Sequence, residues 1–276
     1  MTISIIITIT FSFAIFMFTM HFTKELSNIK RLIATAIAVT SISIFGFYFF
    51  DSALILNLLP FTDTIIYGNL AIPIASIIAA LLFQSKKIPT WRQIILIICI
   101  ITFACRPTFK VLTASIPITT NTINNKVHIQ SHRSTCGPTA AATLLSHHGI
   151  NATETELVPL CLTTTDGTFI HGLYRGLKIK TKNTNLKVKA GICTLDELKT
   201  KIPLPAIIPV RLTESVNDRE PRYANQWHWQ LNVTHTIVVY SFQNNKVQIA
   251  DPAVGKEQWD IKSLQDLWHG TYITIK

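Results

Sequence analysis

Four long apolar segments in the first 110 residues constrain the fold of this chain more than any other feature. An α-helix needs about 20 apolar residues to cross a bilayer. The segments that approach this length are residues 3–22, 32–50, 65–83 and 91–109. We expect an all-α transmembrane domain of about four helices over residues 1–110, with Pro73 as a kink in the third. Because the fourth apolar run is short, three crossings are the alternative.

The charges between these segments predict how the helices are oriented. Three basic residues lie between the first two segments and three lie at the junction of the last two, whereas residues 51–64 hold two acidic residues and no basic one. Loops rich in Lys and Arg stay in the cytoplasm, so the first and third loops are expected there. With four crossings, everything after residue 110 then lies outside the cytoplasm. Arg106 and Lys110, just past the fourth apolar run, argue for the opposite side.

Residues 111–125 carry no charge and are expected to form a linker. The composition after them is that of a globular domain. Residues 111–276 carry 17 basic and 12 acidic residues, an excess too small and scattered to favour nucleic acid as a partner. The one basic stretch, residues 178–189, has no aromatic residues on which bases could stack. The histidines show no recognisable zinc-ligand spacing, so we expect neither a metal nor another cofactor.

Cys136 has the sequence environment of an activated nucleophile. It precedes Gly137, Pro138 and a run of helix-forming residues that stops at Gly149, which suits the left-handed C-cap of a helix. We therefore expect Cys136 at a helix N-terminus, where the partial positive charge and the free N–H groups favour a thiolate over a thiol. A buried structural cysteine before a helix is the alternative.

A predicted β-hairpin brings an imidazole and a carboxylate together. Residues 234–242 and 246–250 are rich in Val and Ile and predict two strands joined by an Asn-Asn turn. His235 begins the first strand and Asp251 follows the second, so both are expected at the same end of the sheet. An imidazole that is held by a carboxylate and faces a thiol is the arrangement of a cysteine nucleophile with its base. Gln130 could donate an amide N–H to a developing oxyanion.

The order of these features resembles that of a known family, the papain-like peptidases that cleave double-glycine leaders from bacteriocins and related secreted peptides. The matching blocks run from Val127 to Trp259 in the order Gln130, Cys136-Gly137-Pro138, His147-His148-Gly149, Asp166-Gly167-Thr168, Leu195-Asp196-Glu197-Leu198, Leu204-Pro205-Ala206-Ile207, His235-Thr236-Ile237 and Ala250-Asp251-Pro252. The resemblance implies an α+β papain-like cysteine peptidase domain over residues 126–276. It also implies a bacterial cytoplasmic membrane as the location of the transmembrane helices.

The resemblance assigns a role to each candidate site residue. Cys136 would be the nucleophile, His235 the general base and acid, and Asp251 the carboxylate that orients the imidazole. Gln130 would contribute to the oxyanion hole. The implied substrate is a peptide or precursor protein with a leader segment, cut after small residues such as Gly-Gly.

This sequence departs from the family in two respects. Well-known members are fused to an ATP-driven exporter, whereas no Gly-x-x-x-x-Gly-Lys-Ser/Thr phosphate loop occurs here, so an exporter is expected as a separate partner. The connection that precedes His235 is also longer than usual. It contains Trp227 and Trp229, which are candidates for the border of the substrate cleft or for core aromatics. Cys161 and Cys193 are the pair available for a disulfide in an oxidising compartment, or they stay reduced.

The function predicted from these observations is that of a membrane-anchored cysteine endopeptidase that works through an acyl-enzyme. Two alternatives remain open at this stage. One is a docking module that recognises a leader without cutting it, and the other is an enzyme that passes the acyl group to an amine instead of water. An intact set of four site residues favours an enzyme, because a pure binder needs no nucleophile with its base.

Overall fold

The computed structural model describes residues 2–50, 52–57 and 70–276. The chain divides into two compact units. The first comprises Met1–Ser52 and Leu59–Ala114, and the second comprises Ala53–Leu58 and Ser115–Lys276. We call them the membrane unit and, after the resemblance noted in the sequence, the peptidase unit, and each is described by itself.

The membrane unit consists of apolar helices. They are α1 (Thr2–Phe22), α2 (Asn28–Ile44), which continues into the π-helix η1 (Phe45–Phe49), α5 (Ala71–Phe83) and α6 (Thr90–Thr113). Large apolar side chains point outward from these helices, as do Ile9 (61% exposed) and Phe13 (64% exposed), which suits contact with lipid. Within the described residues, three helices are long and apolar enough to span a membrane, and α5 is a shorter apolar helix.

The third predicted segment differs from the helix that is described. Residues 65–69 of that segment lie outside the described part of the chain, and α5 begins at Ala71. Pro73 therefore lies in the first turn of α5 rather than in its middle. A proline there breaks no intrahelical hydrogen bond, so the expected kink does not arise. The N-terminal region thus has three candidate membrane spans and one shorter apolar helix, and these indicate a membrane anchor.

Arg31 joins two helix ends inside the membrane unit. Its buried guanidinium donates to the backbone carbonyl groups of Thr23 at 3.3 Å, Leu26 at 3.2 Å and Gln84 at 3.0 Å. Thr23 follows the last residue of α1 and Gln84 follows the last residue of α5. Carbonyl groups at helix C-termini lack intrahelical partners and favour a cation. One of the basic residues that predicted the orientation therefore also has a structural role.

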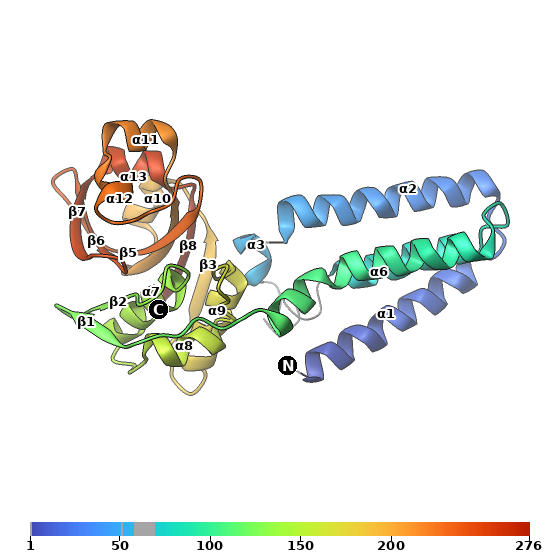
Figure 1. Ribbon diagram of the computed structural model, residues 1–276, viewed down its shortest axis with the longest axis horizontal. Helices are drawn as coiled ribbons and strands as arrows, with labels where there is room; N and C mark the ends of the chain where they lie inside the picture. Colours follow the sequence, from blue (N-terminus) through green and yellow to red (C-terminus); the bar gives the residue numbers. More distant parts are fainter. Residues whose placement is uncertain (1, 51, 58–69) are drawn as a thin grey trace. The chain divides into compact units, whose positions relative to one another are not determined.

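The peptidase unit combines one antiparallel sheet with several short helices (Figure 1). The six-stranded sheet has the order β3-β8-β4-β5-β6-β7, and β1 and β2 form a separate pair. The strands are β1 (Thr122–Asn124), β2 (Val127–Ile129), β3 (Val188–Ile192), β4 (Ala206–Arg211), β5 (Thr234–Gln243), β6 (Lys246–Asp251), β7 (Gly255–Asp260) and β8 (Thr271–Ile275). The helices are α3 (Ala53–Leu56), α7 (Cys136–His147), α8 (Glu154–Leu160), α9 (Ile170–Lys180), α10 (Leu195–Thr200), α11 (Glu214–Arg219), α12 (Arg222–Asn225) and α13 (Ile261–Leu267). This is the α+β arrangement that the sequence predicted.

The hairpin of β5 and β6 follows directly from its sequence. Asn244 and Asn245 both adopt positive φ angles, 45° and 63°, as a two-residue type I′ turn requires. Such a turn matches the right-handed twist of the two strands, and Gln243 pairs with Lys246 across it. The Val and Ile side chains of β4 and β5 are buried in the core of this unit. The sheet therefore holds the far end of the hairpin, where β5 begins and β6 ends, in a defined position.

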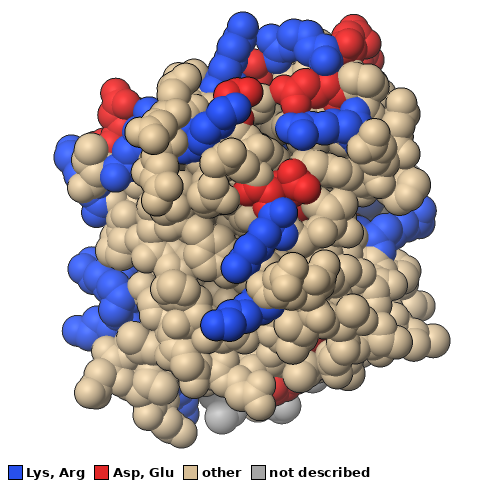
Figure 2. Space-filling view, turned by 90° about the vertical axis from the view of Figure 1, so that its left-hand side faces the viewer, with Lys and Arg blue, Asp and Glu red and all other residues tan. Residues whose placement is uncertain are grey.

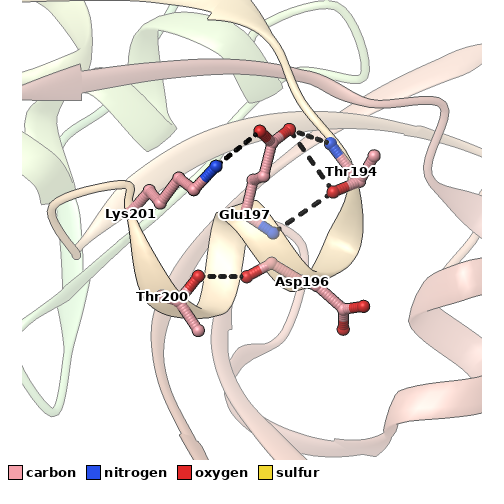
Figure 3. A network of polar contacts seen from close by, with 5 residues as sticks. All are labelled: Thr194, Asp196, Glu197, Thr200 and Lys201. Carbon is pink, nitrogen blue, oxygen red and sulfur yellow. Dashed lines mark hydrogen bonds and ion pairs between the residues drawn. The ribbon is translucent and has the colours of Figure 1, made fainter.

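A capping box determines where α10 begins (Figure 3). The Glu197 N–H donates to Thr194 Oγ1 at 3.3 Å, and the Thr194 N–H donates to the Glu197 carboxylate at 3.1 Å. This reciprocal pair satisfies two backbone donors that a helix N-terminus leaves without partners. Lys201 forms an ion pair with the same carboxylate at 3.0 Å, one turn further along.

The segment expected as a linker, residues 111–125, belongs to the peptidase unit from Ser115 onward and is hydrogen-bonded within it. Helix α6 extends to Thr113, and residues 122–124 form β1, which pairs with β2. The carbonyl group of Ser115 accepts a hydrogen bond from the Thr165 N–H at 3.0 Å. Although most of its side chains are exposed, this segment is therefore not a free tether.

Charged side chains are scattered over the visible face of the peptidase unit (Figure 2). Lys and Arg lie beside Asp and Glu near the upper edge and near the centre of this face, and uncharged residues make up most of the remainder (Figure 2). Mixed charges of this kind are typical of a solvated surface, and they give this face no continuous basic stripe of the type that binds nucleic acid.

Candidate active site

The thiol of Cys136 lies at the first residue of α7. Thr135 precedes it, and the carbonyl group of Thr135 accepts the first helical hydrogen bond, from the Thr139 N–H, at 3.0 Å. The first-turn N–H groups favour negative charge on the sulfur. Gly137 permits the loop with Thr168 to approach, because a Cβ atom at Gly137 would lie 3.1 Å from the Cβ of Thr168.

The β5–β6 hairpin brings His235 and Asp251 together. His235 is the second residue of β5 and Asp251 is the last residue of β6. His235 Nε2 lies 2.7 Å from Asp251 Oδ1. The same oxygen accepts a hydrogen bond from the Ala253 N–H at 2.7 Å, and the Asp251 side chain is fully buried. The Ala253 N–H therefore holds the carboxylate, and the carboxylate orients the imidazole.

The thiol and the imidazole are coupled electrostatically. Burial alone would raise the pKa of Cys136, but a hydrogen bond and positive charge from His235 and hydrogen bonds from Thr236 lower it below its ordinary value. Burial also acts to lower the pKa of His235, but the charge and hydrogen bond of Asp251, together with Cys136, raise it to about 10. Because the thiol becomes more acidic and the imidazole more basic, the thiolate–imidazolium pair is favoured at neutral pH.

Thr236 is a contributor that sequence reasoning missed. Its side chain and its backbone both form hydrogen bonds that favour the charged form of Cys136. No sequence signal marks Thr236, because its contact with the thiol depends on how α7 packs against β5. Its position directly after His235 is the one local hint.

Gln130 lies beside the thiol, directly after β2. Together with Cys136 and His235 it lines a cavity of about 290 Å³. The Gln130 N–H donates to the carbonyl group of Pro252 at 2.8 Å, which links this residue to the turn that follows Asp251. The Gln130 Oε1 atom is buried and has no hydrogen-bond partner among the described residues. The backbone bond to Pro252 therefore holds Gln130 in place, whereas its side-chain oxygen makes no hydrogen bond to the described residues.

Trp227 and Trp229 fit both roles that the sequence left open. Both line the 290 Å³ cavity, and both are buried in an aromatic cluster with Tyr223 and Trp259. Trp229 is 6% exposed, and its ring centroid lies 4.4 Å from that of His235, with the rings inclined at 43°. Trp229 thus contacts the imidazole directly, and nothing in the sequence marked this contact.

The other cysteines lie apart from this cavity and are unpaired. All five cysteines are free thiols, so Cys161 and Cys193 do not form a disulfide. Burial raises the pKa of Cys161 to about 12, and burial together with Glu197 raises that of Cys193 to about 11. The described part of the chain contains no group of three or more His, Cys, Asp or Glu residues that could hold a metal ion.

Comparisons with known proteins place the peptidase unit in a family. The model of the peptidase C39 family matches residues 124–216 and 220–276. An uncharacterized protein of Methanothermobacter thermautotrophicus is 27% identical over 128 residues, which is 46% of this chain and 72% of that protein. The lactococcin-G-processing and transport ATP-binding protein LagD of Lactococcus lactis subsp. lactis is 29% identical over 151 residues. That match covers 55% of this chain but 19% of LagD.

Two solved structures are also similar to this chain. One is a double glycine motif protease from an AMS/PCAT transporter in complex with the leader peptide, with 18% identity and a TM-score of 0.42. It covers 59% of this chain and 95% of its own. The other is the peptidase domain of Streptococcus ComA, with 22% identity and a TM-score of 0.42 over 53% of this chain and 94% of its own. Because the family model matches more than half of the sequence, this chain belongs to the peptidase C39 family.

Proposed function

We propose that this chain is a membrane-anchored cysteine endopeptidase that cleaves a leader or precursor peptide through an acyl-enzyme. The observation that carries the proposal is the hydrogen-bonded series Asp251–His235–Cys136 at the N-terminus of α7. A sulfur that is held as a thiolate beside an imidazolium is ready both to attack a carbonyl carbon and to receive a leaving group.

The geometry suggests how each step would proceed. The Cys136 thiolate attacks the scissile carbonyl carbon, and Gln130 donates to the oxyanion that forms. Because His235 Nε2 is engaged by Asp251, Nδ1 faces the thiol and gives its proton to the leaving amine as the C–N bond breaks. Nδ1 then takes a proton from water, whose oxygen attacks the thioester and releases the acid and the free thiolate.

We propose that cleavage follows small residues, with a Gly-Gly pair preferred. The family membership and the names of the relatives support this, because one relative processes lactococcin G and another is a double glycine motif protease. There is also a physical reason. Buried aromatic side chains, Trp227 and Trp229, border the cavity beside Cys136, and a narrow cleft admits residues without bulky side chains by excluding the others. The relatives' names also support a separate exporter as partner.

Profiling of the full-length chain in detergent against a peptide library tests this specificity. We expect cleavage after Gly-Gly and Gly-Ala, and at least a hundredfold lower kcat/KM when the residue before the cut is Leu or Phe, because discrimination of about 3 kcal/mol corresponds to about that factor. A preference for a large apolar or basic residue, with glycine rejected, would overturn the double-glycine assignment. Failure of a thiol-reactive peptide electrophile to label Cys136 would favour the docking module, and product masses would separate hydrolysis from transfer to an amine.

We further propose that the peptidase unit lies outside the cytoplasm. Helix α3, which follows the second candidate span, belongs to the peptidase unit and packs on β3 and α9. Asn57 follows this helix and forms two hydrogen bonds with the backbone of Ala190 in the edge strand β3. The Asn57 amide donates to the Ala190 carbonyl group, and the Ala190 N–H donates to Asn57 Oδ1 at 3.3 Å. The loop after α2 and the peptidase unit would then share one side of the membrane. Because that loop has acidic residues and no basic one, the outside is favoured.

A pair of reporters fused after Lys276 tests this orientation. We expect activity from a reporter that works only outside the cytoplasm and none from a reporter that works only inside it. The same reporters fused after Lys86, between α5 and α6, are the matched control and should give the reverse pattern. Cytoplasmic activity at Lys276 would mean an odd number of crossings and a peptidase that faces the cytoplasm.

A further inference from the structure

The segment that leads from the membrane unit is hydrogen-bonded to the loop that carries Gln130. The Thr120 N–H donates to Ser131 Oγ at 2.9 Å, and Ser131 directly follows Gln130. The Ser131 hydroxyl in turn donates to Glu154 at 2.9 Å. The Ser131 hydroxyl group therefore connects the linker with the first residue of α8. It does so directly beside Gln130, which marks the oxyanion side of the site.

Glu154 holds Ser131 firmly. Its carboxylate is 1% exposed and accepts the Ser131 N–H at 2.9 and 3.2 Å in addition to the hydroxyl. It is also the first residue of α8, where the helix N-terminus favours an anion. A buried carboxylate needs such donors to offset its lost hydration, so displacing Ser131 would be costly.

Two further contacts fasten the linker beside Ser131. Asn121 Oδ1 accepts the Thr155 N–H at 3.2 Å and the Thr155 hydroxyl at 3.1 Å. The Thr119 hydroxyl donates to the Thr155 hydroxyl at 2.9 Å. Thr155 follows Glu154, so residues 119–121 contact both the start of α8 and Ser131. We call residues 119–121 the strap.

The position of the Gln130 side-chain amide depends on the hydrogen bonds of its neighbour Ser131. Its buried Oε1 atom has no hydrogen-bond partner in the described part of the chain, so the position of its amide depends on the backbone on either side. Its own N–H is bound to the carbonyl group of Pro252, and the next residue, Ser131, is bound to Glu154 and to the strap. A displacement of Ser131 would therefore move the Gln130 amide relative to Cys136.

We propose that Ser131 and Glu154 are positioning residues for the oxyanion side of the site, and that the strap holds Ser131 in place. A displacement of the strap would move Ser131 through Thr120 and change turnover without touching the nucleophile. The inference rests on the proposed function, because it assigns positioning residues to the same site.

The test uses the full-length chain in lipid nanodiscs and a matched pair of variants. Thr120→Pro removes the N–H that reaches Ser131, whereas Thr120→Ala keeps that N–H and removes only an exposed side chain. Loss of a whole oxyanion donor costs about 100- to 1,000-fold in kcat, so a misplaced donor is expected to cost about tenfold. We expect this loss for Thr120→Pro and for Ser131→Ala, with KM unchanged and with Thr120→Ala close to wild type.

Two measurements distinguish a displaced Gln130 from a disturbed fold of the peptidase unit. The rate at which iodoacetamide alkylates Cys136 depends on the thiolate–imidazolium pair and not on Gln130, so it should stay at the wild-type value. In a Gln130→Ala background, Ser131→Ala should have no further effect on kcat, because the residue through which it acts is gone. If Thr120→Pro does not fold, Asn121→Ala loosens the same strap through Thr155 and should lower kcat in the same direction.

Each other outcome overturns the proposal. Equal kcat values for Thr120→Pro and Thr120→Ala would show that the strap does not position Ser131 for catalysis. Parallel loss of alkylation, or additive effects of Ser131→Ala and Gln130→Ala, would show that these residues support the fold only. Failure of the wild-type chain to cleave any peptide, with alkylation intact, would instead remove the proposed function and the coupling with it.

Discussion

Cys136→Ala is expected to lower kcat for peptide cleavage by about a million-fold, the size of the loss when a nucleophile is removed from a triad that acts as a unit. The sulfur supplies the covalent step, and no neighbouring side chain can replace it. Replacing the thiol with a hydrogen leaves at most a small void at the cavity wall, so the melting temperature should change little. Cleavage rate and thermal unfolding, measured on the same preparation, test both statements.

Cys193→Ala is the matched control for this variant. Cys193 is also partly exposed, but it does not line the cavity that contains Cys136, and burial with Glu197 keeps its pKa well above neutral. The Cys193 variant should therefore cleave like the wild type. Wild-type turnover by Cys136→Ala would show that the chain does not use this thiol, and the endopeptidase proposal would be abandoned.

His235→Ala is expected to cost about ten-thousand-fold or more in kcat, because it removes both the base and the acid. It should also change how the alkylation of Cys136 depends on pH. In the wild type the hydrogen bond and charge of His235 lower the pKa of Cys136, so fast alkylation extends to lower pH. Without the imidazole, burial raises the pKa of the thiol, and the alkylation profile should move to higher pH.

The direction of this shift distinguishes an ion pair from a thiol that merely lies near a histidine. The raised pKa of His235, about 10, means that the imidazolium persists through neutral pH and is lost only as the pH rises through that value. The wild-type rate should therefore reach its plateau at a lower pH than the variant rate. Identical profiles for the two proteins would contradict the pairing of Cys136 with His235.

Much of the candidate site could be predicted from the sequence because its placement depends on local rules. Gly149 adopts a positive φ of 72° after α7, as a helix C-cap prefers, so the position of Cys136 at the other end of that helix was readable. Asn244 and Asn245 turn the hairpin in the same way, and this turn determines which ends of β5 and β6 meet. The resemblance to a family then supplied the role of Gln130.

The sequence by itself determined the apolar helices, the helix that begins at Cys136 and the hairpin that ends at Asp251, because each depends on residues that are close together along the chain. Only the tertiary structure decided what surrounds them. The ring contact of Trp229 with His235, the bonds of Thr236 to the thiol and the contact of Asn57 with Ala190, 133 residues away, depend on how separate elements pack. The bond from Thr120 to Ser131 likewise connects the predicted linker with the loop that carries Gln130. Such contacts leave no periodic pattern in the sequence, since a single polar or aromatic side chain fits many environments until packing selects one.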